Sequence, residues 1–456
     1  MKMNYQGKTV LVVGAAKSGL ASVRFLLGCG ARVILTDTRS NEALKDEIAP
    51  LRDLAADSGK LVLELGGHQN ASFAACNLVV VSPGVPLSLP YFEISRKAGI
   101  PIIAEIELAY RHLEGKIIGI TGSNGKTTTT ALVSELLTGA GMKGHAAGNI
   151  GTPLISFAID SSTEDCYVVE LSSFQLESIR EFRPFIGSIL NLTPDHMDRY
   201  PGFEDYISVK KRIFMNQEKT DFAVLNADDP RTEAMKTEVR AKPMLFSRLH
   251  PLEQGAFVRD DRVIFRSAEG ERDLFPVNAI ALKGAHNLEN VLAACAMAIL
   301  VGAPPESLED SIRKFKGVEH RIEWVAELEG IQYFNDSKAT NIDATIKSLE
   351  AFPGNILLII GGRDKAGDFT ALRSLVRERV KYLVLIGEAA DKIRKALAGT
   401  VDIREAQSME DAVSICRSLA HRGDIVLLAP ACASFDMFQN YEHRGRVFKE
   451  AVCRVQ

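Results

Sequence analysis

The sequence lacks the features of several classes of protein. Its seven cysteines are spread singly and never form a Cys-x-x-Cys pair, which argues against a disulfide framework or a thiolate metal site. No apolar run reaches the roughly 18 residues that a transmembrane helix needs. Met1 leads into an expected strand rather than into a basic segment and an apolar one, so no signal peptide is expected. These absences predict a cytoplasmic protein with reduced, buried thiols.

An excess of charge of one sign is also missing. Lys and Arg number 54 and Asp and Glu number 58, which gives a net charge of -4. No basic surplus exists to attract nucleic acid or an anionic membrane, so neither is expected as a partner, and anions must be bound at local sites. The chain does have an ordinary globular composition, with 46% hydrophobic and 25% charged residues over 456 positions. At about 150 residues per domain, this length predicts three domains.

Three buried-strand patterns run into or up to glycine, at residues 9–14, 116–121 and 355–361. Continuous β-branched runs are typical of parallel strands covered on both faces, and they alternate here with amphipathic helical stretches. We therefore expect an α/β protein with three domains in series, at residues 1–105, 106–317 and 318–456. Residues 240–280 instead alternate in polarity around Asp260-Asp261 and predict a small hairpin.

The first glycine loop, at residues 14–19, follows a strand and opens a helix, and Asp37 ends the next strand. This is the outline of a dinucleotide fingerprint. However, Ala16 replaces the glycine that lets a pyrophosphate approach the backbone. Three interpretations stay open: an NAD-dependent oxidoreductase, a Rossmann-like domain that binds another nucleotide, and a tight turn without a ligand. The segment Ser82-Pro-Gly84 would lie at the same carboxyl edge of the sheet.

The second glycine loop is the strongest signal in the chain and lies between an expected strand and helix. Backbone N–H groups of such a loop converge on phosphate oxygens, Lys126 places positive charge on the β- and γ-phosphates, and the Thr127 hydroxyl can bind Mg²⁺. The loop departs from the common P-loop because Ile120 stands where glycine is usual. We predict a nucleotide-phosphate site formed by Gly122, Ser123, Asn124, Gly125, Lys126, Thr127 and Thr128.

Acidic and histidine side chains follow two further strands. Glu170 ends an apolar strand, where an acidic Mg²⁺ ligand would stand, although a lone strand-end Glu is more often a helix-capping partner. His196 lies between Asp195 and Asp198, a setting that suits a second metal ion or a charged intermediate. The basic run at residues 210–212 is by itself more typical of a solvated helix face.

The central loop, taken with Glu170 and residues 195–198, resembles the Mur ligase superfamily, whose members are ATP-dependent amide-forming ligases. The resemblance covers the whole chain in order, because residues 284–290 match the HN..N segment and residues 320–323 match the opening of the third domain. Residues 335–341 and 434–445 are similar to the D-glutamate-adding branch. The motifs of the diaminopimelate-adding and alanine-adding branches are absent. A folylpolyglutamate synthase, which belongs to the same superfamily, remains the alternative.

The resemblance implies a fold and an activity. It implies a Rossmann-like first domain that binds a UDP-sugar, a central P-loop-type ATPase domain with a parallel sheet, and a Rossmann-like third domain for the incoming amino acid. The reaction would add D-glutamate to UDP-N-acetylmuramoyl-L-alanine through an acyl phosphate, in cytoplasmic peptidoglycan precursor synthesis. ATP and two Mg²⁺ ions would take part, and the enzyme would be a monomer.

The resemblance also implies roles for individual residues. Lys126, His196 and Lys210 would be catalytic, with Lys210 carbamylated because it, rather than Lys211, begins the Lys-x-x-Ile-Phe pattern. The metal ligands would be Thr127, Glu170, His196 and Lys210, and further ATP contacts would be Asn287, Asn290, Arg321 and Asp336. The UDP-sugar contacts would be Lys17, Ser18, Asp37, Thr38, Arg39, Ser82, Gly84 and Asn149. The D-glutamate contacts would be Lys338, Thr340, Lys365, Ser434 and Tyr441, the last replacing a commoner phenylalanine.

Overall fold

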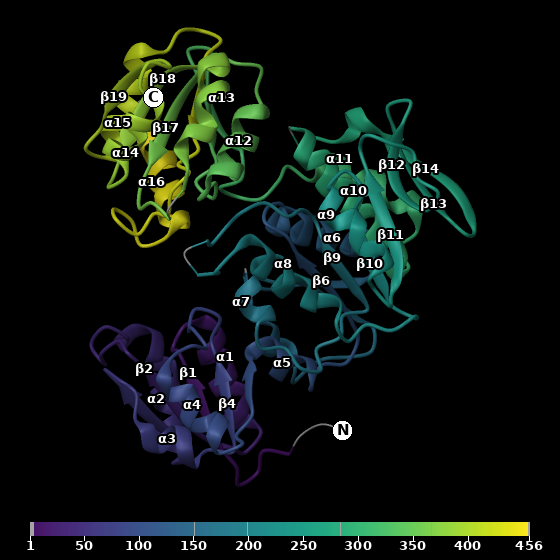
Figure 1. Ribbon diagram of the computed structural model, residues 1–456, viewed down its shortest axis with the longest axis vertical. Helices are drawn as coiled ribbons and strands as arrows, with labels where there is room; N and C mark the ends of the chain where they lie inside the picture. Colours follow the sequence, from purple (N-terminus) through teal and green to yellow (C-terminus); the bar gives the residue numbers. More distant parts are fainter. Residues whose placement is uncertain (1–3, 150, 198, 283, 366, 455–456) are drawn as a thin grey trace.

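Three sheets follow one another along the chain and form three lobes (Figure 1). The computed structural model describes residues 4–454 except 150, 198, 283 and 366, and it leaves out the side chains of residues 52–58. Asp198, which the sequence placed beside His196, therefore lies outside the described residues. The three-domain α/β architecture confirms the predicted fold class. Among the described residues, no helix has both the length and the apolar character needed to cross a lipid bilayer.

The first sheet has five parallel strands in the order β3-β2-β1-β4-β5. Alternate side chains of β1 pack into two different apolar clusters, because helices cover both faces of the sheet. Its strands are β1 (Thr9–Val13), β2 (Arg32–Asp37), β3 (Leu61–Leu65), β4 (Leu78–Val81) and β5 (Ile102–Ala104), and its helices are α1 (Lys17–Gly28), α2 (Lys45–Ser58), α3 (Asn70–Ala75) and α4 (Pro90–Lys97).

The central sheet has nine strands in the order β14-β13-β12-β11-β10-β9-β6-β8-β7. Its strands are β6 (Lys116–Thr121), β7 (Lys143–Gly148), β8 (Asp165–Glu170), β9 (Ile186–Ile189), β10 (Phe222–Asn226), β11 (Lys242–Ser247), β12 (Gly255–Arg259), β13 (Arg262–Ser267) and β14 (Gly270–Pro276). Its helices are α6 (Lys126–Gly139), α7 (Ser173–Leu176), α8 (Phe203–Lys211), α9 (Pro230–Ala234), α10 (Ala285–Val301) and α11 (Leu308–Lys314).

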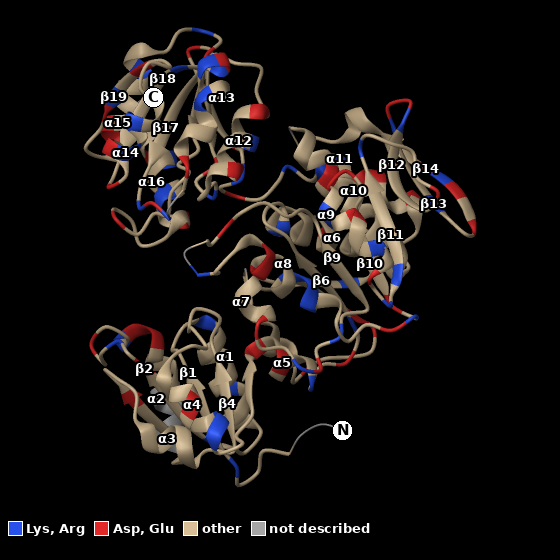
Figure 2. Ribbon diagram, viewed as in Figure 1, with Lys and Arg blue, Asp and Glu red and all other residues tan. Residues whose placement is uncertain are grey.

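The hairpin predicted between residues 240 and 280 is present and extends this central sheet. Strands β12 and β13 pair in antiparallel register across Asp260 and Asp261, which both adopt positive φ angles. β14 continues the antiparallel pairing to the edge of the sheet. Figure 2 shows acidic and basic residues interspersed along β13 and β14, and ion pairs such as Arg266–Glu271 join the strands there. The exposed edge is therefore rich in charge, which disfavours pairing with other strands.

The third sheet has six strands in the order β15-β16-β20-β17-β18-β19, parallel except for the β15–β16 pair. Its strands are β15 (Glu323–Leu328), β16 (Ile331–Asn335), β17 (Ile356–Gly361), β18 (Val380–Ile386), β19 (Asp402–Glu405) and β20 (Ile425–Leu428). Its helices are α12 (Ile342–Glu350), α13 (Arg373–Arg379), α14 (Ala390–Leu397), α15 (Met409–Leu419) and α16 (Tyr441–Arg454).

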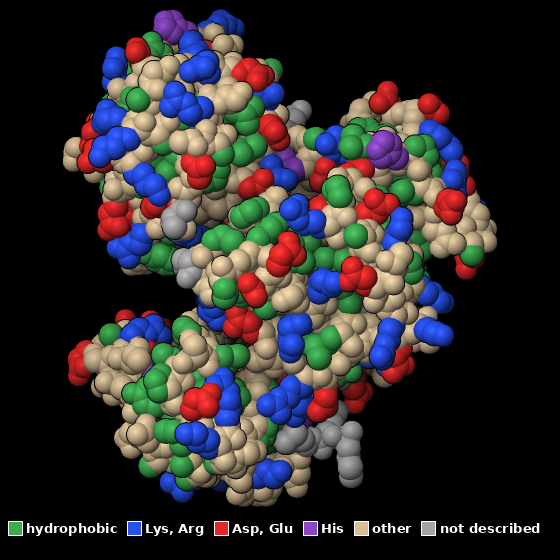
Figure 3. Space-filling view, viewed as in Figure 1, with side chains coloured by type: hydrophobic (Ala, Val, Ile, Leu, Met, Phe, Trp, Pro, Cys, Tyr) green, Lys and Arg blue, Asp and Glu red, His purple; other side chains and the backbone are tan. Residues whose placement is uncertain are grey.

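The two joints between the domains differ in character. The first and central domains share one apolar cluster, to which α5 (Glu105–Tyr110) contributes Ile106 and Leu108, and the short helix at Leu154–Phe157 contributes Leu154 and Ile155. The apolar clusters found in the described part of the third domain contain no residue of the central domain. In the space-filling view of Figure 3, a deep indentation separates the first and third lobes beside the central one.

Candidate active site

The phosphate loop joins the end of β6 to the start of α6 and is held from both sides. The Asn124 N–H donates to Asn191 Oδ1 at 2.8 Å, and Ser123 Oγ donates to the Thr193 carbonyl at 2.7 Å. Gly125 has a φ of +82° and packs so closely that a Cβ there would lie 2.2 Å from Asn290 Oδ1. Both the backbone angle and the contact require glycine at this position.

Two lysines, the half-buried Lys126 and the buried Lys210, meet beneath this loop. Lys126 Nζ donates to the carbonyls of Gly122 at 2.9 Å and Ser123 at 2.8 Å. Lys210, from α8, is only 1% exposed, and its Nζ donates to the same Gly122 carbonyl at 2.9 Å and to Thr121 Oγ1 at 3.1 Å. Burial lowers the pKa of both amines, that of Lys210 strongly. Lys210 is thus no solvated surface residue, contrary to what its basic run alone would indicate.

Glu170 stands at the end of β8 next to the loop. Its Oε1 accepts a hydrogen bond from Asn149 Nδ2 at 3.0 Å, whereas its buried Oε2 has no hydrogen-bond partner among the described residues. Although burial opposes ionisation, Lys338 and Lys126 lower the pKa of Glu170. A buried carboxylate oxygen without a protein partner, close to the Thr127 hydroxyl of a phosphate loop, fits a bound divalent cation.

His196 lines the same cavity as the phosphate loop. It adopts a positive φ of 57°, and its backbone N–H donates to Asp195 Oδ1 at 3.0 Å. Its Nε2 is 3.8 Å from Asp195 Oδ2, and its ring packs edge-on against Phe174. A positive φ at a residue other than glycine stores strain that is frequent at functional sites.

The third domain brings lysines to this same cavity, which has a volume of about 410 Å³. Lys338 Nζ donates to Thr127 Oγ1 at 2.6 Å and lies 5.0 Å from the centre of the Tyr441 ring. Burial lowers the pKa of Lys338 to about 8. Lys365 Nζ lies 3.5 Å from Thr340 Oγ1. Lysines of one domain therefore face the phosphate loop of another.

The structure does not bring every expected residue to this cavity. Ser434 is buried and does not line it, whereas its neighbour Phe435 does. Ser434 was expected there only because the family resemblance implies that it contacts D-glutamate. The chain direction at this turn, which no local pattern indicates, decides which of the two side chains reaches the cavity.

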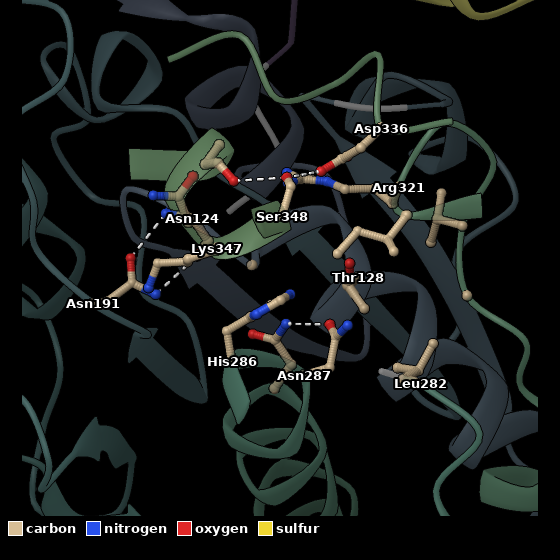
Figure 4. Close-up of a pocket in the computed structure, with 16 residues that line it drawn as sticks. Asn124, Thr128, Asn191, Leu282, His286, Asn287, Arg321, Asp336, Lys347 and Ser348 are labelled. Carbon is tan, nitrogen blue, oxygen red and sulfur yellow. Dashed lines mark hydrogen bonds between the residues drawn. The ribbon is translucent and has the colours of Figure 1, made fainter. Parts of the chain in front are cut away.

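A second, narrow cavity adjoins the loop and is drawn in Figure 4. Arg321, Asp336 and Ser348 reach it from the third domain, and His286 and Asn287 reach it from the start of α10. Ser348 donates to Asp336 Oδ2, while Asp336 Oδ1 and Arg321 Nε have no partner among the described residues. Buried polar atoms without partners are costly, so these two fit the hydroxyls and phosphates of a nucleotide.

The first domain gathers its candidate residues at one edge. Lys17 and Ser18 begin α1, while Thr38, Arg39 and Gly84 follow the carboxyl ends of β2 and β4. Asp37 Oδ2 accepts the Ala15 N–H at 2.7 Å and a bond from Arg39 Nη2 at 3.0 Å, and Ser82 Oγ donates to the Gly14 carbonyl at 2.9 Å. Asp37 and Ser82 therefore also hold the glycine turn in place. Asn149 lies apart from this group, against Glu170 in the central domain.

Three residues of the site were missed as candidates in the sequence. Asn191 pins the loop, and Tyr206 lies under Lys210, with its hydroxyl 3.3 Å from Ser123 Oγ. Arg444 is 1% exposed and donates to Ser337 Oγ at 3.0 Å, to the Ser337 carbonyl at 2.7 Å and to the Cys432 carbonyl at 3.1 Å. It ties together the two third-domain segments that flank the cavity. The Arg444-Gly445 pair was visible in the sequence, but its burial was not.

The fold and site together define a nucleotide-dependent enzyme whose candidate active site lies between the central and third domains. Comparison with known proteins makes this specific. The chain matches the Mur ligase MurD-like N-terminal domain over residues 8–104, the Mur ligase middle domain over 120–298, and the Mur ligase glutamate ligase domain over 320–432.

Relatives match over the full length. The UDP-N-acetylmuramoylalanine–D-glutamate ligases of Koribacter versatilis and Acidobacterium capsulatum are 49% and 48% identical, covering 99% of this chain and 99% and 97% of their own. Among solved structures, the pseudomurein peptide ligase type C of Methanothermus fervidus has a TM-score of 0.63 at 18% identity, covering 99% of this chain and 100% of its own. The MurF ligase of Thermotoga maritima in complex with ADP has a TM-score of 0.62 at 16% identity, covering 100% and 97%. The chain belongs to the Mur ligase family.

Proposed function

We propose that this protein is an ATP-dependent ligase that adds D-glutamate to UDP-N-acetylmuramoyl-L-alanine in cytoplasmic peptidoglycan precursor synthesis. The names of its full-length relatives support this reaction. The observation that carries the proposal is the cavity of about 410 Å³ in which Lys338 and Lys365 of the third domain face Lys126 of the phosphate loop. Such an arrangement can hold an activated phosphate and an amino acid close together.

Each domain then has one substrate. The carboxyl edge of the first domain, residues 1–105, binds the UDP part of the sugar substrate through Lys17, Ser18 and Asp37 and their neighbours. ATP lies between the central domain, residues 106–317, and the third domain, residues 318–456, because Arg321 and Asp336 line the narrow cavity together with Asn287. The third domain holds D-glutamate. We expect the enzyme to act as a monomer, because one chain carries candidate groups for all three substrates.

The reaction begins with two anions that repel each other. A carboxylate oxygen of the sugar substrate attacks the γ-phosphorus of ATP, the bond to the β-phosphate oxygen breaks, and ADP leaves. The amine of D-glutamate then attacks the acyl carbon, a proton leaves the nitrogen, and the C–O bond breaks to release phosphate. Positive charge fixed at the transferring phosphate is the main requirement, and Lys126 on its preorganised loop meets it.

Magnesium ions fit the same cavity. Thr127, Glu170, His196 and Lys210 would hold two ions, which supply positive charge to the phosphate groups when bound. A lysine side chain can bind a metal ion only as a neutral amine or after conversion to an anion such as a carbamate. Because burial lowers its pKa, Lys210 has neutral amine available to attack the carbon of CO₂ and, on losing a proton to solvent, to form a carbamate. Its carbamate would be a further oxygen ligand of the kind that Mg²⁺ prefers.

D-Glutamate has two carboxylates, and two cationic side chains face it. Lys338 and Lys365 bind these carboxylates, Thr340 positions Lys365, and the Tyr441 ring packs against the methylenes. The extra hydroxyl of Tyr441 lies at the ring edge and leaves the packing face unchanged. Ser434 acts through the backbone turn that presents Phe435 rather than through its own side chain.

A substrate panel tests the proposal. ADP release is measured with UDP-N-acetylmuramoyl-L-alanine plus D-glutamate, L-glutamate, L-alanine or diaminopimelate, and with a reduced folate plus L-glutamate. Of the four amino acids tested with UDP-N-acetylmuramoyl-L-alanine, we expect only D-glutamate to give rapid ADP release. Release with the folate would instead favour a folylpolyglutamate synthase, and release with diaminopimelate would contradict the assignment of the amino-acid pocket.

A further inference from the structure

The joint between the central and third domains is polar. Side-chain hydrogen bonds between described residues cross it: Lys338 donates to Thr127 at 2.6 Å, and Asp343 Oδ2 accepts from Thr193 Oγ1 at 3.1 Å and from Asn124 Nδ2. Domains move relative to each other by default unless a large apolar interface joins them. No apolar cluster of the described residues spans this joint, so individual hydrogen bonds set how firmly it closes.

Asp343 is fixed in place by its own helix. It lies in the first turn of α12, where Asn341 caps the helix by accepting the Ala344 N–H at 2.8 Å. A carboxylate is favoured at this end of a helix, so the position of Asp343 suits α12 itself. The same helix lines the narrow nucleotide cavity through Lys347 and Ser348. Movement of Asp343 therefore moves one wall of that cavity.

The partners of Asp343 belong to the two strand ends that form the phosphate site. Asn124 lies within the phosphate loop itself. Thr193 follows β9, and its N–H donates to Ser123 Oγ at 2.9 Å, two residues before Asp195. One carboxylate oxygen thus binds α12 to the loop and to the segment that carries His196. Hydrogen bonds to an ionised acceptor are about twice as strong as neutral ones.

We infer that Asp343 is a latch that holds the third domain closed over the phosphate loop. It is a positioning residue: its carboxylate accepts hydrogen bonds from Asn124 and Thr193, and it keeps Arg321, Asp336 and Lys338 within reach of ligands bound to the central domain. This role rests on the proposed function, because closure matters only if groups bound to two domains must react. Lys338 moves with the same domain, so its own bond to Thr127 forms only when the joint is closed.

The test combines solution scattering with kinetics on the full chain. Asp343→Ala should increase the radius of gyration and lower kcat/KM for both ATP and D-glutamate by about tenfold, within the usual range of coupling between contacting groups. Asp343→Asn, which keeps one carbonyl oxygen, should recover part of both losses. Glu350→Gln removes an exposed carboxylate from the other end of α12 and should match the wild type.

A double-mutant cycle separates the latch from a local effect on α12. Thr193→Val removes only the hydroxyl, and in the Asp343→Ala background it should cause no further loss in kcat/KM, because its partner is already gone. Additive losses, or an Asp343→Ala variant with wild-type scattering and kinetics, would overturn the latch. A lower melting temperature with unchanged scattering would show a helix-capping role instead, which also overturns it. Expansion of Asp343→Ala without any D-glutamate-dependent ADP release by the wild type would retain the latch and reject the proposed function.

Discussion

The carboxyl of Glu105 gives the clearest test of the energetics of this fold. It stands at the start of α5, at the apolar joint of the first two domains, and is 1% exposed. Its Oε1 accepts the Ile155 N–H at 2.7 Å, and its Oε2 has no partner among the described residues. Burial raises the pKa of Glu105 from 4.5 to about 7. The folded chain therefore keeps a proton that the unfolded chain has already released between these two values.

The sign and size of the effect follow from linkage. The folded state binds more protons than the unfolded state between pH 4.5 and 7. The stabilising contribution of protonated Glu105 to the free energy of unfolding is therefore fully present below pH 4.5 and is lost as pH rises through 7. The difference between the two pKa values corresponds to about 3 kcal/mol. Glu105→Gln cannot ionise, so its free energy of unfolding relative to the wild type should rise by about 3 kcal/mol between pH 4.5 and pH 8.

Denaturant unfolding at several pH values measures this difference directly, with thermal unfolding as a second probe. The exposed Glu135→Gln, on α6, is a matched control and should leave the pH dependence of stability as in the wild type. If the wild type and Glu105→Gln differ by the same amount at pH 4.5 and at pH 8, then the buried carboxyl is not destabilised by ionisation. The reasoning from burial would then be wrong.

Three further predictions concern activity. Lys126→Ala should lose at least ~10²-fold in rate, the scale of one preorganised charge at a transferring phosphate, and near-normal turnover would refute the ATP assignment. With ¹³C-labelled CO₂, the carbamate signal in NMR should persist in Lys211→Ala and vanish in Lys210→Ala; the reverse would move the carbamate to Lys211. Lys338, whose pKa is about 8, is charged below that pH and neutral above it. The kcat/KM for D-glutamate of the wild type, divided by that of Lys338→Arg, should therefore fall above pH 8, since arginine stays charged. A ratio that does not change with pH would show that Lys338 does not bind the carboxylate.

Much of the fold was predictable because local signals agreed with one another. The runs at 116–121 and 78–81 are apolar on both faces and became the buried strands β6 and β4. By contrast, β7 reads Lys-Gly-His-Ala-Ala-Gly and has no strand-like pattern, so its pairing with β8 is decided by tertiary contacts. Intrinsic β preference is weak enough for context to override it.

The motifs of the site were predictable from the sequence, but the contacts between its distant segments and domains were less so. The phosphate loop and Glu170 lie together, as their positions at strand ends indicated, whereas for Lys210 only the family resemblance pointed to this cavity. Neither the burial of Arg444 nor the role of Asp343 was predicted, because charged residues on amphipathic helices usually face solvent. Their contacts are with residues far away in the sequence, and no spacing rule reports which domains will touch.

The contact of Gly125 with Asn290 has a consequence for protein engineering. Even a single carbon added at position 125 would collide with an amide held by its own bond to Asn287. The phosphate loop therefore cannot be transferred to another protein by itself. Grafted onto another scaffold, it would need the start of α10 to come with it. A library that randomises position 125 should return glycine even when position 290 is varied in the same clones, because the φ of +82° still disfavours other side chains.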